Sequence, residues 1–183
     1  MIVTLLTTNT FSDASSSVYT SSIDGTYDEY MFVVSAVHSD SQGGNFNINF
    51  SIDGGSNYNV VKTTTIFQAY QQEDDSGTSS VGYQASHDLA QSANQQRLCP
   101  DTGDDPDQSV SGIVHLFSPS STTYVKHFYA TMNHAGGDVA TSAHYSANSY
   151  CAGYCNTTSA INAVQFQDNA GNFDGVIQMY GVA

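Results

Sequence analysis

Residues 46–52 alternate strictly between apolar and polar side chains. The apolar set is Phe46, Ile48, Phe50 and Ile52, and an asparagine or a serine occupies each position between them. Successive side chains of a β-strand point to opposite faces, so this period of two predicts a strand with one apolar and one polar face. Such strands are typical of antiparallel sheets that bury one face and leave the other in water. The alternation therefore indicates an all-β fold.

Strand and turn signals recur along most of the chain. Residues 30–38 carry apolar side chains on both faces, which predicts a central strand covered on both sides. Gly, Asn and Asp cluster at 53–57 and at 168–172, where they supply turns between strands. A long excursion is expected over 71–107, and within it only residues 86–97 suit a short helix. Further strands are expected at 18–23, 58–70, 110–117, 124–133, 161–167 and 176–182.

About eight strands with long, uneven loops fit an antiparallel β-sandwich. A jelly roll is the first choice of sandwich, and an immunoglobulin-like arrangement is the second. At 183 residues the chain has the size of one domain, and it buries enough surface to fold without a metal or a disulfide. We expect residues 27–183 to form this domain, with residues 1–26 as an N-terminal arm or as the first strand.

The charge balance limits the partners. The chain has 3 Lys and Arg against 17 Asp and Glu, which gives a net charge of −14. Only Lys62, Arg97 and Lys126 are available to meet phosphates, which argues strongly against a nucleic-acid partner and against binding to anionic membranes. Charged residues make up 11% of the chain, so the polar surface is mostly uncharged. This composition is typical of an extracellular or virion β-protein rather than of a cytosolic enzyme.

Cysteine usage and the N-terminus bear on the compartment. Cys99, Cys151 and Cys155 are an odd number of cysteines, which argues against a fully paired disulfide framework. The sequence leaves a Cys151–Cys155 bridge open, and we favour free thiols and folding in a reducing cytoplasm. The N-terminus lacks the pattern of a signal peptide, and no stretch is apolar for the length of a membrane span. Release of a phage particle by lysis would carry such a protein out of a cell.

No motif for catalysis or for a cofactor stands out. Ser86, His87 and Asp88 are adjacent, whereas the members of a catalytic triad converge from separate parts of a fold. The glutamates are Glu29 and Glu73, and nothing indicates a pair of converging carboxylates. We therefore expect a protein that is not an enzyme, with no catalytic residues and no cofactor.

Two groups of residues have the chemistry of metal ligands. The aspartates of 101–107 supply oxygen ligands for Ca²⁺, but their spacing departs from the EF-hand pattern, and a solvated acidic loop is the favoured interpretation. His115 and His127 together with Cys151 and Cys155 have the residue types of a zinc site. Nothing in the sequence brings these strands to the cysteine pair, so we favour histidines satisfied within their strands and expect no metal.

Five segments together resemble a known family. They are Tyr27 to Tyr30, the hairpin at 50–58, and the segments 111–119, 161–166 and 171–182. In this order they resemble a β-sandwich module of virion proteins from tailed bacteriophages, especially marine phages and cyanophages. The resemblance covers residues 27–182, and its most specific part is the closing Tyr-Gly-Val after a Gly-Asn-Phe-Asp-Gly turn. It implies a place on the virion surface, as capsid decoration, head fibre or tail-fibre tip, and it supplies no catalytic motif.

Two sets of residues are candidates for contact with partners. Ile2, Val3, Leu5 and Leu6 are apolar and are expected either to anchor an N-terminal arm in a groove or strand of a neighbour, or to belong to the first strand of the domain's own sheet. The second set lies in a Ser-, Ala- and Gly-rich stretch over 142–156, expected as a strand with an exposed loop. Its members are Tyr145, Tyr150 and Tyr154.

Tyrosine among serine, glycine and asparagine is the composition of many binding loops. The tyrosine set is therefore expected to contact a host glycan or a neighbouring subunit, and the alternative is that it caps the end of the sandwich. The absence of tryptophan weakens the glycan interpretation, because sugar platforms often use large aromatic faces.

The favoured hypothesis is a capsid decoration or cement protein, assembled in the host cytoplasm and displayed on the virion surface. Its partners would be the major capsid protein or other virion proteins, and a homo-oligomer such as a trimer is expected around a symmetry axis. The first alternative is a receptor-binding tail-fibre or head-fibre tip that recognises a host surface glycan. The second is a carbohydrate-binding, lectin-like module that uses the acidic loop to bind Ca²⁺.

Overall fold

The computed structural model describes residues 2–75, 77, 79–137 and 144–183. This part of the chain forms twelve β-strands and no helix, and therefore contains no helix able to cross a membrane. The strands are β1 (Val3–Ala14), β2 (Ser17–Tyr19), β3 (Glu29–Ser39), β4 (Gly44–Ser51), β5 (Lys62–Gln72), β6 (Ser80–Tyr83), β7 (Gln96–Thr102), β8 (Val110–Phe117), β9 (Lys126–Gly136), β10 (Tyr145–Cys155), β11 (Ala163–Asp168) and β12 (Phe173–Val182).

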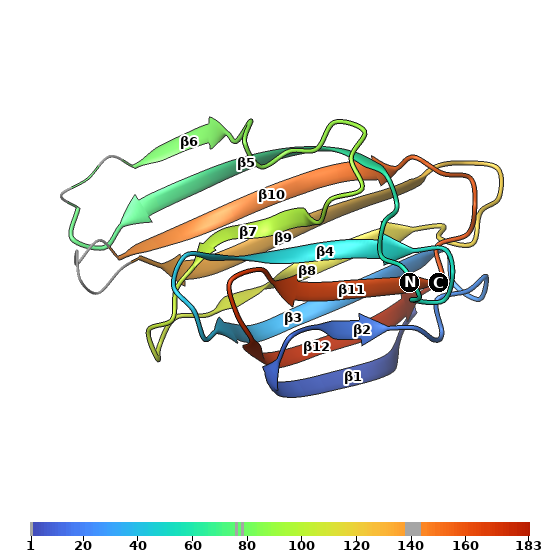
Figure 1. Ribbon diagram of the computed structural model, residues 1–183, viewed down its shortest axis with the longest axis horizontal. Coiled ribbons are helices and arrows are strands. Elements are labelled where there is room, and N and C mark those ends of the chain that lie inside the picture. Colours follow the sequence, from blue (N-terminus) through green and yellow to red (C-terminus); the bar gives the residue numbers. More distant parts are fainter. Residues whose placement is uncertain (1, 76, 78, 138–143) are drawn as a thin grey trace.

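Two antiparallel sheets lie face to face (Figure 1). The eight-stranded sheet has the order β1-β12-β3-β8-β9-β10-β5-β6, and the four-stranded sheet in front of it has the order β2-β11-β4-β7. The two ends of the chain lie side by side, because the Ile2 amide donates to the Ala183 carbonyl at 2.8 Å and the Ala183 amide donates back at 3.0 Å. The expected antiparallel β-sandwich is confirmed, with twelve strands rather than about eight.

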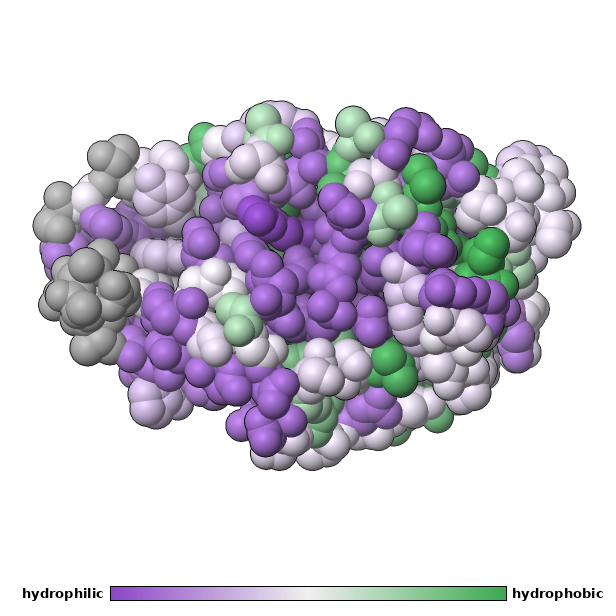
Figure 2. Space-filling model, viewed as in Figure 1, coloured by the Kyte–Doolittle hydropathy of each residue, from purple (hydrophilic) through white to green (hydrophobic). Residues whose placement is uncertain are grey.

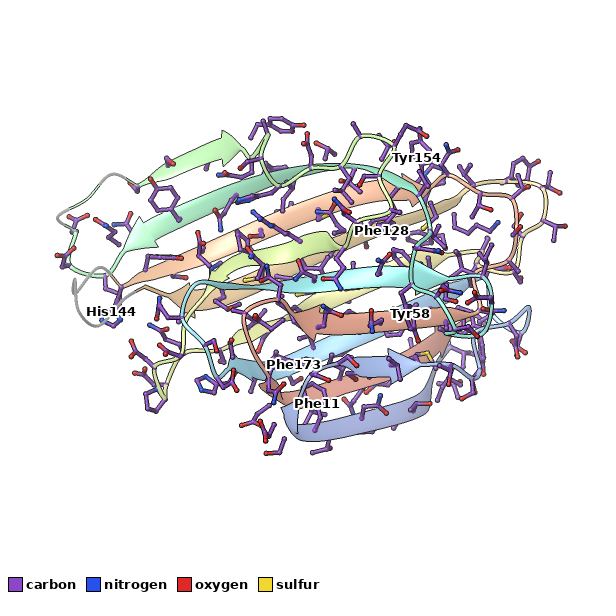
Figure 3. The ribbon with its side chains drawn as sticks, viewed as in Figure 1. Phe11, Tyr58, Phe128, His144, Tyr154 and Phe173 are labelled. Carbon is purple, nitrogen blue, oxygen red and sulfur yellow. The ribbon has the colours of Figure 1, made fainter. Side chains whose placement is uncertain are left out.

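The apolar side chains of the alternating segments meet between the sheets. Phe50 of β4 contacts Phe128 of β9 across this interior, with ring centroids 5.0 Å apart. Phe128 is labelled in Figure 3. Phe166 of β11 is fully buried and lies at the centre of an aromatic cluster. Its ring centroid is 5.4 Å from that of Phe32, 5.7 Å from that of Phe46 and 6.1 Å from that of Tyr19. Sequence alternation therefore translates directly into the core.

The polar face of β4 is covered, contrary to the expectation of a face in water. Asn47 and Asn49 are each only 3% exposed. Segment 84–95 lies over them, and the Asn49 amide donates to the carbonyls of Tyr58 at 2.6 Å and Ala93 at 3.3 Å. The Asn47 amide donates instead to the Asn45 carbonyl of β4 at 2.6 Å, so both buried amides have backbone partners.

The short helix expected at 86–97 is wrong. This segment forms turns and ends in β7, and its backbone pairs with the first half of β5. The Lys62 amide donates to the Ser92 carbonyl at 2.8 Å, and the Thr64 amide donates to the Leu89 carbonyl at 2.9 Å. Serine and asparagine side chains compete with helical hydrogen bonds and weaken a helix here. The backbone of this segment therefore pairs with the free edge of β5 instead.

The strand expected at 30–38 is central, as β3 lies between β12 and β8. It is not covered on both sides. Phe32 and Val34 are buried in the interior, whereas Met31 and Val33 on the other face are only partly buried. The outward side of the eight-stranded sheet has no layer over it at β3. Apolar residues on both faces of a strand were therefore not enough to predict that both faces are covered.

All three cysteines are free and buried. Cys151 and Cys155 lie on the same face of β10, about 13 Å apart at the rise of a strand, which is too far for a disulfide. Burial raises the pKa of each of these two thiols to about 12. The thiolate is the form that attacks disulfide reagents. The raised pKa therefore protects these two thiols from such reagents in the folded protein.

We expect the native protein to show essentially no reaction with a disulfide thiol reagent over minutes. The unfolded protein in guanidinium chloride should release three equivalents without prior reduction, because each of the three cysteines is a free thiol. Colorimetric titration of both states measures this. Rapid reaction in the native state, or fewer than three equivalents after unfolding, would contradict the structure.

Candidate functional site

The outward face of the eight-stranded sheet carries exposed aromatic side chains. Tyr150 of β10 lies directly across from Phe67 of β5, and Phe67 lies across from Tyr83 of β6. The rings of Phe67 and Tyr150 stack with centroids 5.0 Å apart and planes 7° from parallel. They remain 45% and 42% exposed. Cross-strand stacking of this kind holds both rings in place and presents a flat apolar surface to a partner.

A second aromatic group lies on the same face over β8 and β9. His115 stacks on Tyr129 with ring centroids 4.5 Å apart, and Phe117 lies 5.8 Å from Tyr129. The Nδ1 atom of His115 is 2.5 Å from a carboxylate oxygen of Glu29 on β3. This contact fixes the imidazole ring and therefore the plane that it presents.

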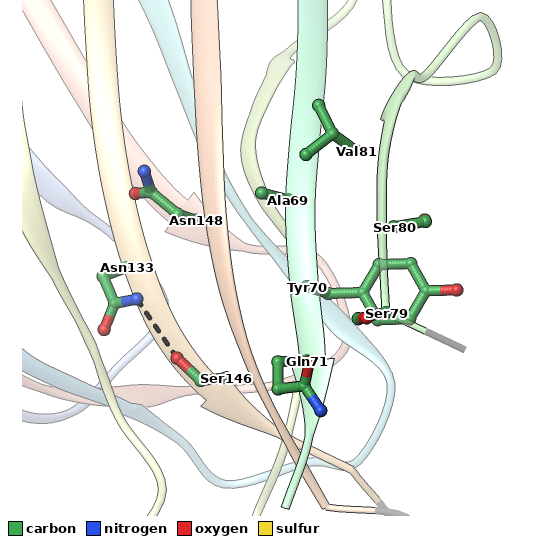
Figure 4. Close-up of a pocket in the computed structure, with 9 residues that line it drawn as sticks. All are labelled: Ala69, Tyr70, Gln71, Ser79, Ser80, Val81, Asn133, Ser146 and Asn148. Atoms are coloured by element: carbon green, nitrogen blue, oxygen red, sulfur yellow. Dashed lines mark hydrogen bonds between the residues drawn. The ribbon is translucent and has the colours of Figure 1, made fainter. Parts of the chain in front are cut away.

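Three shallow hollows run along this face and share their lining residues. The first lies beside Tyr154 and Tyr129, with a volume of about 490 Å³. The second, of about 340 Å³, extends from Tyr129 to Asn133 and Asn148. The third, of about 450 Å³, continues from these asparagines to Tyr70 and the adjoining strand β6 (Figure 4). Together the three hollows form a trough across the sheet, which we call the outer trough.

The outer trough combines aromatic rings with amide and hydroxyl groups. The Asn133 amide donates to the Ser146 hydroxyl at 3.4 Å and to the Ala147 carbonyl at 3.0 Å (Figure 4). Among the outward positions of β3, β8, β9, β10 and β5, Glu29 is the one carboxylate in the described chain, and it is paired with His115. In a chain of net charge −14 this face is therefore unusually free of charge. It suits an uncharged surface or ligand.

The structure divides the predicted tyrosine set. All three tyrosines lie on strand β10 rather than in an exposed loop, which corrects that expectation. Tyr150 and Tyr154 face outward, whereas Tyr145 faces the interior, where its ring meets His134 edge to face at 5.8 Å. The odd spacing between 145 and 150 places these two residues on opposite faces of any regular strand. This odd spacing would have predicted opposite faces from the sequence if the whole segment had been interpreted as a strand.

The aromatic partners of Tyr150 were missed by sequence reasoning. Phe67 and Tyr83 belong to strands far away in the chain, and only the register of β10-β5-β6 brings them together. Period-two alternation on each strand does place Phe67, His115 and Tyr129 outward, so the face was predictable but the neighbours were not.

Of the predicted N-terminal residues, Val3, Leu5 and Leu6 lie in β1, an edge strand of the eight-stranded sheet, and Ile2 directly precedes it. β1 pairs with β12 on one side, and its other edge is open. Ile2, Val3 and Leu5 are 70%, 47% and 50% exposed. Leu6 lies at a register shift and packs against the core. The apolar residues thus sit beside a row of unpaired backbone groups, a combination that favours pairing with another chain.

The side chains considered for a zinc site lie on opposite sides of one sheet. Cys151 and Cys155 face the interior and are buried, whereas His115 and His127 face outward. Therefore these four residues cannot share one metal ion. His115 is instead held by Glu29 and Tyr129, as expected of a histidine satisfied within its sheet.

Comparison of the chain with protein-family models, with curated proteins and with solved structures gave no match. The interpretation of the surface therefore depends on its own chemistry. Two regions carry features of contact with a partner: the outer trough, with its stacked rings and amides, and the open apolar edge of β1.

Proposed function

We propose that this chain is a non-enzymatic surface protein of a tailed-bacteriophage virion and that it decorates the outer shell of the capsid. The segments between residues 27 and 182 that resemble phage virion modules support this proposal. The polar surface, mostly uncharged but with a net charge of −14, supports it as well, because it keeps crowded copies soluble and away from DNA.

The strand order gives further support. Strands β1-β12-β3-β8 in one sheet and β2-β11-β4-β7 in the other fit the two Greek keys of a jelly roll, with the hairpins β5-β6 and β9-β10 extending the first sheet. Jelly rolls recur in viral capsid proteins and in lectins. The order therefore favours a jelly roll over an immunoglobulin-like sandwich. A jelly roll in turn fits the decoration and lectin-like hypotheses.

The observation that carries the decoration role is the open edge of β1 with exposed Ile2, Val3 and Leu5. An exposed apolar edge strand is a liability unless a partner covers it. The major capsid protein would cover it by strand addition, in which backbone hydrogen bonds supply affinity and apolar side chains supply specificity. A homo-oligomer such as a trimer would place three such edges around a symmetry axis of the shell.

We expect a variant carrying Ile2→Ser, Val3→Ser and Leu5→Ser to lose capsid binding by at least about tenfold, because burial of these side chains supplies much of the interface energy. Co-sedimentation with particles assembled without this protein measures the loss. The matched control is Val81→Ser with Tyr83→Ser on β6, the opposite edge of the same sheet, where the side chains are 75% and 59% exposed. Equal binding of both variants would contradict a role for β1.

Copy number in purified particles separates the proposal from its alternatives. A ratio near parity with the major capsid protein supports decoration, and a few copies per hundred capsid subunits supports a receptor-binding fibre tip. The uncharged, aromatic outer trough is the observation that favours the tip, because stacked rings and amides are suited to a neutral host glycan. Absence from particles together with binding of sugar alone would favour the lectin-like module.

A further inference from the structure

One cation of this chain reaches solvent. Of Lys62, Arg97 and Lys126, both lysines are fully buried. The Lys62 ammonium donates to the Asn49 side-chain oxygen at 2.6 Å and to the Val60 carbonyl at 2.7 Å, and the Lys126 ammonium donates to the Thr157 carbonyl at 3.2 Å. Arg97 of β7 is partly exposed. It is therefore the one lysine or arginine side chain that offers a positive charge to a ligand.

The Arg97 guanidinium has no acidic partner within the described part of the chain. The one ion pair there joins His115 to Glu29, so no described carboxylate lies within 4.0 Å of Arg97. Asp88 lines the same hollow as Arg97, and its carboxylate accepts a hydrogen bond from the Tyr83 hydroxyl. In a protein with 17 acidic residues, an arginine left without a carboxylate is available for an outside anion.

Arg97 lines a polar hollow of about 630 Å³ on the outward side of the four-stranded sheet. The hollow combines side chains from β4, from the segment after β4, from segment 86–95 and from the turn before β12. Figure 2 shows a continuous hydrophilic area over β4 and β7 on this face, and Tyr58 lies beside β4 (Figure 3). The polar lining of the hollow also includes Asn47, Asn94 and Asn169.

Tyr58 and His87 line the hollow, but their unpartnered atoms do not face it. The Tyr58 hydroxyl and the His87 Nδ1 atom are buried and have no partner in the described chain, so neither reaches a ligand in the hollow. Burial and the neighbouring Arg97 lower the pKa of His87, so this imidazole is neutral at pH 7 and Arg97 carries the positive charge. The groups that meet a ligand are therefore Arg97 and the exposed amides of Asn94 and Asn169.

The walls of the hollow are held firmly. The Gln96 amide donates to the His87 carbonyl at 3.1 Å, and the Asn49 amide reaches the carbonyls of Tyr58 and Ala93. The segment that carries His87 is also joined to β5 by backbone hydrogen bonds. The polar groups are therefore arranged before a ligand arrives, which reduces the entropy lost on binding.

We propose that this hollow binds a saccharide unit that carries a carboxylate, such as a uronic acid. The planar guanidinium of Arg97 pairs with the carboxylate through two parallel hydrogen bonds. The side chains of Asn94, Gln95 and Asn169, which are exposed or partly exposed, supply donors and acceptors for the ring hydroxyls. One cation serves one carboxylate, and the surrounding negative charge repels polyanions such as nucleic acid. This site is separate from the outer trough and from the edge of β1, and it does not depend on a place in a virion.

Calorimetric titration of the full chain with methyl glucuronide, methyl glucoside and acetate tests the proposal. We expect glucuronide to bind at least about tenfold more tightly than either glucoside or acetate, because only glucuronide offers both a carboxylate and ring hydroxyls. Arg97→Gln should reduce glucuronide affinity by at least about tenfold, and Arg97→Lys should retain part of it. Asn94→Ala, which removes one exposed amide, should weaken glucuronide binding and leave acetate binding unchanged.

The matched control is Asn133→Ala on the outward face of the other sheet, which should bind glucuronide as the unchanged protein does. Thermal unfolding of each variant shows whether the fold is intact. Failure of glucuronide to bind overturns the proposal, and so does equal binding of glucoside or retention of affinity in a folded Arg97→Gln variant. Equal binding of acetate also overturns it, because the hollow would then be a site for any small anion.

Discussion

Replacement of Phe166 with alanine is expected to lower the free energy of unfolding by about 3–5 kcal/mol. Phe166 is fully buried, and its ring contacts those of Phe32, Phe46 and Tyr19 from both sheets. The substitution removes the transfer energy of the ring and leaves a cavity that strands from two sheets cannot readily close. Urea unfolding, with the midpoint and the slope both fitted, measures the change.

The control for this substitution is Phe67→Ala on the outer trough. Phe67 is 45% exposed and contacts Tyr150 on one side, so we expect a loss of about 1 kcal/mol or less. A similar loss for both variants would show that the two sheets do not share the tight aromatic centre described above. The comparison therefore tests the packing of the sandwich rather than general sensitivity to alanine.

Stability should fall between about pH 6.5 and pH 4 because of one buried histidine. His134 of β9 is 1% exposed, and neither ring nitrogen has a partner among the described residues. Burial lowers its pKa to about 4, whereas an unfolded chain gives histidine a pKa near 6.5. The unfolded state therefore takes up the proton first as the pH falls, and folding loses about 3 kcal/mol across this window. Below the folded pKa, the loss from this group is complete.

His134→Leu should remove most of this dependence, because leucine has a similar volume and no proton to bind. At pH 7 the variant should be as stable as the unchanged protein or more stable, since two unpartnered buried nitrogens are lost. Denaturant unfolding at several pH values measures both effects. The control is His127→Leu on the exposed outward face of β9, which makes the same substitution on the same strand without changing the interior. An unchanged slope in His134→Leu would show that other groups cause the acid sensitivity.

The two contact regions place different demands on a partner. The edge of β1 offers backbone groups and aliphatic side chains, whereas the outer trough offers stacked rings with few charges. The regions belong to one sheet, but β6 and β1 are its opposite edges. A chain attached to a shell through β1 would leave the outer trough over β5 and β10 away from the attachment. Decoration and recognition are therefore compatible in one molecule.

Alternation along single segments was enough to predict the fold class and the inward side of most strands. Phe46, Ile48 and Phe50 are buried as the period of two indicates, and Val110–Phe117 is a strand with the expected bounds. Ile52 is the exception in the alternating set, because it lies beyond the end of β4 and is 43% exposed. Composition was enough to predict a mostly uncharged polar surface with very few cations and a net negative charge. These properties are local, because the geometry of a strand fixes which side chains share a face whatever the strand pairs with.

Pairing between distant segments could be read only from the tertiary structure. The cover over Asn47 and Asn49, the stack of Phe67 on Tyr150, and the place of Val3–Ala14 beside β12 all depend on sheet order. The two buried lysines, which leave Arg97 as the accessible cation, depend on it as well. Periodicity determined which face of a strand is apolar. The tertiary structure alone decided which strands are neighbours and what covers them, because these are set by contacts between residues far apart in the chain.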